Sequence, residues 1–221
     1  MSGLFAAVGL APLSLLAIAL MTFGAAAIRG LTGFGMAIIL VPLLGLVIPP
    51  AMAVTLAIFL QLLIGPVGLR VILADADRTS ALTIALVAMV ATPLGIALLK
   101  VTPMDAARLV IAGIAILAFA LVLLPPHADG HKPGRLATGL TGIASGVLTG
   151  FAAMPGPPVV PYYLRQSLPP AVARASMMLV FFGTAIAGSA ASLAMGVASM
   201  RTVWLALILF LPMLAGNWVG G

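Results

Sequence analysis

The sequence predicts an all-α fold: a polytopic helical membrane protein built from two inverted repeats whose helices are broken by glycine and proline. The composition excludes a soluble domain, because 63% of the 221 residues are hydrophobic and only 6% are charged, whereas soluble domains carry about a quarter charged residues. The charge-free runs suit spanning helices of about 20 residues, and they lack the alternation of barrel strands. These runs are 1–28, 30–69, 79–99, 109–126, 136–164, 175–200 and 202–221.

An internal repeat places glycine and proline at matching positions in the two halves. Both copies contain LTGF, then a Val-Pro pair, then a Pro-Pro-Ala turn. The offset between matched residues grows from 117 to 120, so the copies differ by small insertions. Broken apolar segments at corresponding places in two halves are typical of transporter binding sites. The matched positions are Leu31–Phe34 with Leu148–Phe151, Val41-Pro42 with Val160-Pro161, and Ile48–Ala51 with Leu168–Ala171.

In the first half, residues 1–126, prolines and charges set the expected helix ends. Pro49-Pro50 marks a turn, because proline lacks an N–H and constrains the residue before it. Gly65-Pro66 marks a late kink, and Arg70–Arg78 is expected to be a charged loop. Thr102–Asp105 is typical of a helix start. The expected helical stretches are Leu4–Ile28, Gly30–Val47, Ala51–Leu69, Thr79–Leu99 and Arg108–Leu124.

A polar linker at 127–134 separates the halves, and the second half covers 135–221. Its Pro155–Pro158 sequence interrupts a long apolar run, as glycines do in the first half. The first half has one more helix after its internal proline, so symmetry predicts that the second half lacks a final span. The expected stretches are Leu136–Met154, Val159–Leu164, Ala171–Ser199 and Arg201–Gly221.

The charges favour an anion as the ligand. The chain has ten Lys and Arg, four Asp and no Glu, and every Asp and His lies between the apolar runs. Arginines are the ionisable residues nearest to apolar sequence. The lack of cysteine excludes a disulfide and a thiolate metal site, and His127, Asp129 and His131 in a Pro/Gly loop do not make a metal site. We therefore expect no catalytic group, no metal, no cofactor and no nucleic-acid partner.

The helix breaks are the predicted binding site. Non-helical backbone is tolerated at membrane depth only where it is buried in protein or lines a cavity, and the free N–H groups of a half-helix suit an oxyanion. Two alternatives stay open: small residues also let membrane helices pack closely, and an arginine near a helix end can extend to the membrane surface. The predicted substrate-binding residues are Arg29, Thr32, Gly33, Gly35, Gln61, Thr149, Gly150, Gly156, Arg174 and Ser176.

Aromatic residues and loop charges give weaker signals. Tyr162, Tyr163, Trp204 and Trp218 are interpreted as aromatics at the membrane–water interface. Successive loops carry similar numbers of Lys and Arg, so the positive-inside rule does not decide the orientation of the chain.

The repeated motifs resemble the TauE/SafE family of sulfite exporters and anion permeases. The first copy runs from Gly30 to Pro42, and the second runs from Gly146 to Pro161 and on to Ala173–Ser176. The glycine run is thinner than the family's usual GxGGG, and Pro155–Pro158 replaces glycines in the second copy. The resemblance implies a duplicated protein of the bacterial inner membrane that moves small anions such as sulfite or sulfonates.

Other functions remain open on the residues alone. An anion channel would need a continuous polar pore, and the transported anion could be a small carboxylate. An intramembrane enzyme would need a catalytic pair inside the spans, and a scaffold would not need two matched breaks. No Asp, Glu or His lies in a predicted span, so coupling to H⁺ or Na⁺ would rely on the anion itself or on backbone carbonyls. A homo-oligomer is compatible with the sequence.

Overall fold

The computed structural model describes residues 11–123 and 133–221, and within these residues it is helical with no strands. The predictions for residues 1–10 and 124–132, including the start of the first span at Leu4 and most of the polar linker, lie outside the described residues. The helices are α2 (Pro12–Thr32), α3 (Met36–Leu44), α4 (Pro50–Ile64), α5 (Leu69–Asp75), α6 (Arg78–Val101), α7 (Met104–Leu123), α8 (Arg135–Ala152), α9 (Gly156–Leu164), α10 (Pro170–Ala194) and α11 (Met200–Gly220).

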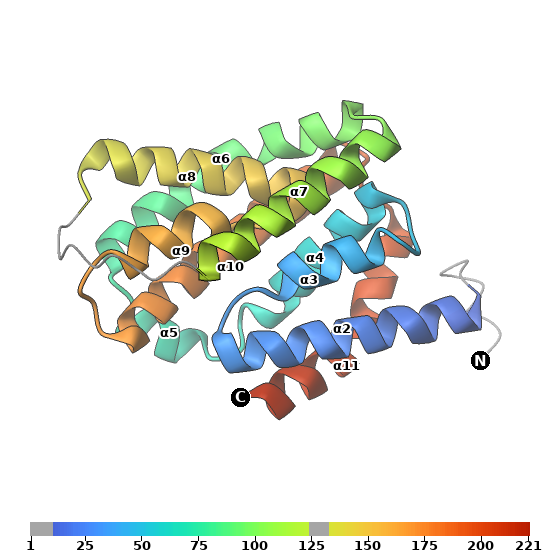
Figure 1. Ribbon diagram of the computed structural model, residues 1–221, viewed down its shortest axis with the longest axis horizontal. Coiled ribbons are helices and arrows are strands. Elements are labelled where there is room, and N and C mark those ends of the chain that lie inside the picture. The colour runs from blue at the N-terminus through green and yellow to red at the C-terminus, as the bar shows by residue number, and fades with distance from the viewer. Residues whose placement is uncertain (1–10, 124–132) are drawn as a thin grey trace.

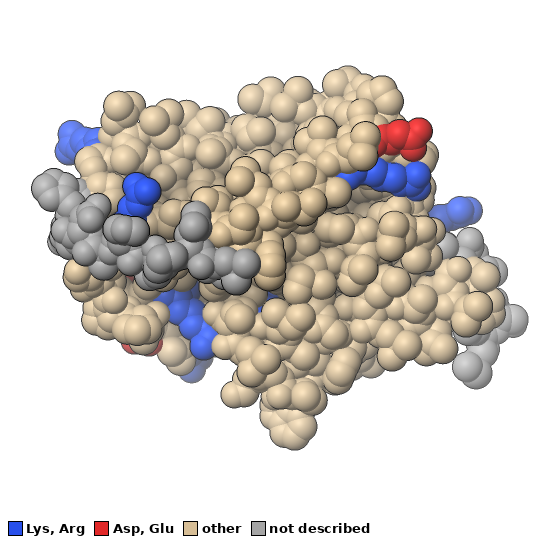
Figure 2. Space-filling view, viewed as in Figure 1, with Lys and Arg blue, Asp and Glu red and all other residues tan. Residues whose placement is uncertain are grey.

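The described helices fit an integral membrane protein, as the composition predicts. Five of them, α2, α6, α7, α10 and α11, are long and apolar enough to span a membrane, and the bent pair α4 and α5 gives a sixth candidate. In Figure 2 the Lys, Arg and Asp side chains lie mainly toward the two ends of the long axis, and a broad uncharged band lies between them. Such a band matches the apolar layer of a bilayer.

The first half differs from its predicted layout at two places: α2 continues through Arg29 and Gly30 to Thr32, and residues 51–75 form two helices. The expected span Ala51–Leu69 is two helices, because α4 ends at Ile64 and α5 leaves it at 81°. Gly65-Pro66 and Gly68, with φ of +76°, form the corner. The predicted charged loop Arg70–Arg78 is therefore wrong for most of its length. Its apolar residues continue a helix to Asp75, and one of them, Ile72, is buried in the protein.

Two broken helix pairs lie at the centre of the fold. In each pair a long helix ends, the chain turns within three residues, and a nine-residue helix with an internal proline follows: α2 with α3, and α8 with α9. In Figure 1, α2 and α8 run in opposite directions, and α3 and α9 also run in opposite directions away from the middle of the molecule. The two nine-residue helices therefore present their N-termini to the same central region.

Helices of the two halves are interleaved in the packing. The most extensive contacts join α6 to α8 and α2 to α11, and each of these pairs takes one helix from either half. Glycines allow the close approach. A Cβ on Gly146 or Gly150 of α8 would strike the backbone of α6, and a Cβ on Gly216 of α11 would strike the backbone of α2. This use of glycine matches the packing alternative for small residues in membrane helices.

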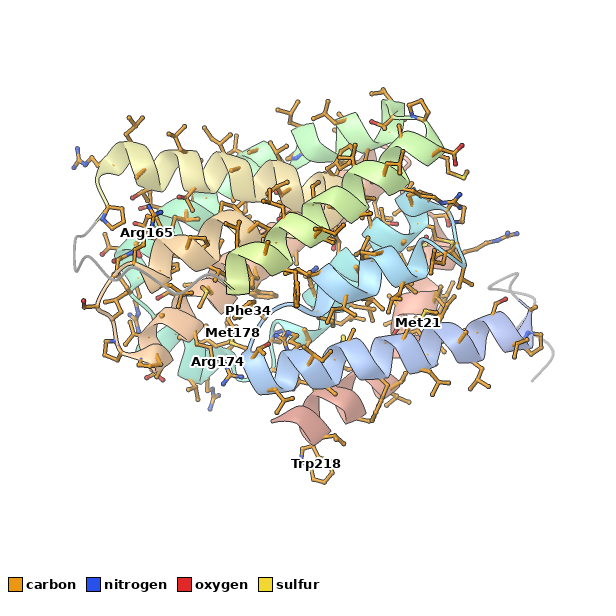
Figure 3. The ribbon with its side chains drawn as sticks, in the orientation of Figure 1. Met21, Phe34, Arg165, Arg174, Met178 and Trp218 are labelled. Carbon is orange, nitrogen blue, oxygen red and sulfur yellow. The ribbon has the colours of Figure 1, made fainter. Side chains whose placement is uncertain are left out.

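The tyrosines are not lipid-facing aromatics, which corrects the interpretation of Tyr162 and Tyr163. Both are buried, and Tyr163 is 0% exposed. The Tyr163 hydroxyl lies 2.9 Å from Oγ of Ser80, and the Tyr162 hydroxyl lies 2.9 Å from Oγ1 of Thr138. A buried phenol needs a hydrogen-bond partner, and α6 and α8 supply these hydroxyls. Trp204 and Trp218, by contrast, are exposed, and Trp218 projects away from the bundle in Figure 3.

The close contact between α6 and α8 gives a matched pair of substitutions. We expect Gly146→Ala to lower the free energy of unfolding by about 1–3 kcal/mol, because its Cβ would overlap the carbonyl oxygen of Ala88. Gly139→Ala lies on the same helix in open space, so it should be neutral or should stabilise by up to about 1 kcal/mol through helix propensity. Unfolding in detergent, followed by circular dichroism, measures both, and equal stability of the two variants would contradict this packing.

Candidate functional site

A cavity of about 50 Å³ lies where the two helix breaks meet. Its volume is several times the roughly 10–15 Å³ that a single water molecule needs, so it has room for a small ion. The lining includes Gly35 to Ile38 from the first break and Ala153 to Gly156 from the second. Arg29 and Gln61 add polar groups, while Met178, Phe181 and Phe182 of α10 add apolar ones.

The first break depends on two glycines with left-handed backbone. Gly33 ends α2 with φ of +82°, and Gly35 precedes α3 with φ of +88°. Residues with a Cβ rarely adopt this conformation. Thr32 supports the turn: its hydroxyl donates to the carbonyl oxygen of Phe34 at 2.6 Å and lies 2.8 Å from that of Ile28. Thr32 is exposed and does not line the cavity.

Arg174 of α10 crosses the end of α2 at the first break. Its Nη2 donates to the carbonyl oxygen of Gly30 at 2.9 Å, which is one of the carbonyls that a helix end leaves without a partner. Its side chain lies directly on Gly33, and a Cβ there would overlap Nε, Cγ and Cδ of the arginine. Gly33 is therefore needed both for its backbone conformation and for the passage of Arg174.

Arg29 reaches the cavity from the last turn of α2. Its Nη1 donates to Oδ1 of Asn217 on α11 at 2.8 Å, so a neutral amide and not a carboxylate orients it. The only ion pair among the described residues joins Arg108 and Asp105, at the start of α7. The charge of Arg29 is thus not neutralised by an acidic partner in the described part of the chain.

The second break has a different local structure from the first. Ala153 ends α8 in the left-handed region, with φ of +58°, and it is the only described residue other than glycine with positive φ. Nε2 of Gln61, on α4, donates to the Ala153 carbonyl oxygen at 3.0 Å. The buried Ser145 hydroxyl donates to the carbonyl oxygen of Pro155 at 3.1 Å. Side chains thus hold both carbonyls of this break.

In the structure, the residue of the second break that corresponds to Gly33 lies three residues after the one that the sequence repeat pairs with it. The sequence repeat pairs Gly33 with Gly150, but the residue that ends α8 in the position of Gly33 is Ala153. Thr149 and Gly150 lie inside α8, where Thr149 bonds the carbonyl oxygen of Ser145 and Gly150 packs against Thr92 and Ile96 of α6. The LTGF copies therefore occupy different places relative to their breaks.

The hydrogen bonds at the breaks leave mainly donors facing the cavity. The side chains described above donate to freed carbonyl oxygens, whereas the hydrogen bonds of the described residues include no acceptor for the N–H groups of Gly35, Met36 and Ala37. These groups lie at the N-terminus of α3, which carries the positive end of the helix dipole. In α9, Pro157 and Pro158 have no N–H to offer. The donors are therefore concentrated on the α3 side.

The structure brings together four of the ten predicted residues. Arg29, Gly35, Gln61 and Gly156 line the cavity, and Gly33 and Thr32 shape the turn beside it. Ser176 does not line the cavity. Its buried hydroxyl donates to the Val172 carbonyl oxygen and accepts from the Asp77 N–H at the start of α6. Arg174 lines a separate hollow between α5 and α10. No group of three or more possible metal ligands occurs among the described residues.

Sequence reasoning missed Asn217 and the apolar lining. Asn217 is one polar residue near the end of an apolar run, and no motif in the sequence links it to Arg29. Phe34, Met178 and Phe181 are ordinary apolar residues of membrane helices, and only the tertiary fold places them around the cavity. Figure 3 shows Phe34, Met178 and Arg174 close to one another where the first break faces α10.

Comparison with known proteins gives one match. Residues 18–221 match the family model described as sulfite exporter TauE/SafE. No curated protein and no solved structure matches the chain. The match spans both helix breaks and every residue of the site.

The two glycines of the first break should respond differently to alanine. We expect Gly35→Ala to cost about 1–2 kcal/mol of stability from backbone strain alone, because its Cβ would meet open space. Gly33→Ala should cost about 1–3 kcal/mol more, because the Cβ also overlaps Arg174. Thermal unfolding of detergent-purified variants measures the difference.

A double variant separates strain from overlap. Adding Arg174→Ala to Gly33→Ala should cost less than Arg174→Ala costs in the wild type, because in the Gly33→Ala protein it also relieves the overlap with the new Cβ. If the losses of stability in the double variant are strictly additive, the contact between Gly33 and Arg174 is contradicted. A Gly33→Ala variant as stable as Gly35→Ala would contradict it too.

Proposed function

The chain belongs to the TauE/SafE family of sulfite exporters, and from this premise we propose that it is a secondary transporter that exports small anions, sulfite or organosulfonates, across the bacterial inner membrane. The anion binds in the central cavity between the two breaks. Its binding groups are Arg29, the amide of Gln61 and the N–H groups at the start of α3. The family is one of transporters, so no catalytic step is needed.

The observation that carries the proposal is the excess of donors over acceptors in the cavity. Arg29 brings a positive charge that no described carboxylate neutralises, and the α3 N-terminus brings free N–H groups with a favourable dipole. Oxygen atoms of an anion would satisfy these donors, which the protein itself leaves without acceptors. The volume of about 50 Å³ favours a compact anion such as sulfite over a bulky one.

Two core clusters, each containing helices from both halves, support alternating access as the mechanism. One core cluster joins α2, α3, α4, α7 and α11 with the C-terminal ends of α6 and α8, and a second joins α5, α9 and α10 with the first half of α6, so α6 contributes to both. The cavity lies between residues of both clusters. Rocking of one cluster against the other would expose it to each side of the membrane in turn, as in other transporters built from repeats. Export would be driven by the membrane potential acting on the anion or by H⁺ or Na⁺ moving with it.

Uptake into proteoliposomes tests the proposal. Labelled sulfite, sulfoacetate and lactate are compared, so that sulfur anions are distinguished from carboxylates. We expect saturable transport of the sulfur anions by the wild type. Arg29→Gln, which removes the charge and keeps a polar side chain, should reduce transport at least tenfold, because it removes a charged hydrogen bond worth roughly 1.5–3 kcal/mol. Gln61→Glu should reduce it as strongly, because a carboxylate would repel the anion.

The matched control is Arg165→Gln, at the exposed end of α9 and away from the cavity. It should transport like the wild type. If lactate is transported in preference to the sulfur anions, the proposed substrate class is wrong but the proposed site stands. Flux that does not saturate would favour a channel, and no flux of any anion by folded protein, with or without H⁺ and Na⁺ gradients, would refute the transporter.

A further inference from the structure

A second hollow, of about 600 Å³, lies beside the central cavity between α5 and α10. Its walls are Val67, Gly68 and Val71 on one side and Pro170, Ala171 and Arg174 on the other. It is wider and more open than the central cavity, and most of its lining residues are exposed.

Two side chains separate this hollow from the central cavity. Ile72 and Met178 line both spaces, so each has one side toward the hollow and one toward the cavity. Ile72 is buried, and Met178 is half-buried. Methionine has an unbranched side chain with several rotatable bonds, so it can move aside without a change of backbone. The hollow and the cavity are therefore neighbours, separated by a single layer that these two side chains form.

Arg174 is held in the hollow and does not extend freely to the membrane surface. Its Nη2 is fixed by the carbonyl oxygen of Gly30, and its stem lies on Gly33. Nε lies against Gly33, so Nη1 is the guanidinium nitrogen that these contacts leave for a ligand. The hollow also contains Asp75, which is exposed. A guanidinium can bind a planar or pyramidal oxyanion through two parallel hydrogen bonds.

We propose that this hollow is the entry vestibule and a first binding site for the anionic substrate, with Arg174 as its anion-binding group and with Ile72 and Met178 as the barrier to the central cavity. The proposal rests on the proposed transport function. It assigns the two arginines to successive sites: Arg174 collects the anion from the aqueous side, and Arg29 holds it at the centre. Asp75 is negatively charged like the anion, so it repels the anion and shortens the time for which the anion stays bound.

Cysteine labelling tests the vestibule without any transport assay, because the natural chain has no cysteine. Ala171→Cys places a thiol in the hollow, and Ala37→Cys places one in the central cavity. The rates of labelling by an anionic methanethiosulfonate, which carries a sulfonate, and by its cationic counterpart are measured in purified protein. We expect Ala171→Cys to favour the anionic reagent, and Ala37→Cys to react at least tenfold more slowly than Ala171→Cys.

Charge variants then identify the binding group. In the Ala171→Cys protein, Arg174→Gln should lower the ratio of anionic to cationic labelling rates by about tenfold, because one nearby unit charge is lost. Arg174→Lys should keep most of the ratio, and Asp75→Asn should raise it. Arg165→Gln is the matched control and should leave it unchanged. Sulfoacetate should slow the labelling of Ala171→Cys only where Arg174 is present; sulfite is avoided because it attacks the reagent.

The outcomes separate the two proposals. If neither Arg174→Gln nor Asp75→Asn changes the ratio of anionic to cationic labelling rates, the vestibule proposal is wrong, even if the wild type transports anions. Ala37→Cys labelling as fast as Ala171→Cys, with no further increase in Met178→Ala, would overturn the barrier. A ratio that depends on Arg174 in a protein that transports none of the tested anions would support the anion site at the hollow and reject the transport function. Should Arg174→Gln fail to fold, Asp75→Asn alone decides.

Discussion

A helix broken inside a membrane frees backbone groups that lipid cannot hydrogen-bond, and the rest of this structure follows from how those groups are satisfied. Four freed carbonyl oxygens near the breaks receive donors from side chains: those of Gly30, Phe34, Ala153 and Pro155 bond to Arg174, Thr32, Gln61 and Ser145 respectively. Two of these bonds join different helix pairs, since Arg174 ties α10 to α2 and Gln61 ties α4 to the end of α8. The same bonds that make the breaks tolerable therefore hold the helices around the cavity in place.

The side chains that donate to the freed carbonyl oxygens determine the electrostatic character of the cavity. Once the carbonyls have partners, the groups left facing the cavity are N–H donors and the guanidinium of Arg29. A cation would find few free acceptors there, whereas an oxyanion completes the hydrogen bonding. No acidic residue is among those that line the cavity, which fits the same logic, because a carboxylate at this place would compete with the ligand for every donor.

The sequence predicts the parts of this arrangement that depend on local chemistry, and it misses those that depend on tertiary contacts. Charge-free runs, the proline turns and the glycine break at Gly33 and Gly35 are local features, and the described helices agree with them. The pairing of Gly150 with Gly33 fails as a structural equivalence, because α8 continues past Gly150 while packed on α6 and ends only at Ala153. The burial of Tyr163 and the contact of Arg29 with Asn217 likewise join residues distant in sequence, and no pattern within either segment predicts them.

The pairing of α2 with α11 has a consequence for how the protein is made. The first described helix packs mainly against the last one, so its partner is synthesised only after the whole of the intervening chain. At ribosomal speeds of about 5–20 residues per second, the wait between Thr32 and Met200 is on the order of ten to thirty seconds. During that interval α2 sits in the bilayer with the faces of Gly30 and Arg29 uncovered. Biogenesis must therefore keep α2, with a charged side chain that lacks its amide partner, stable in lipid until α11 has been synthesised.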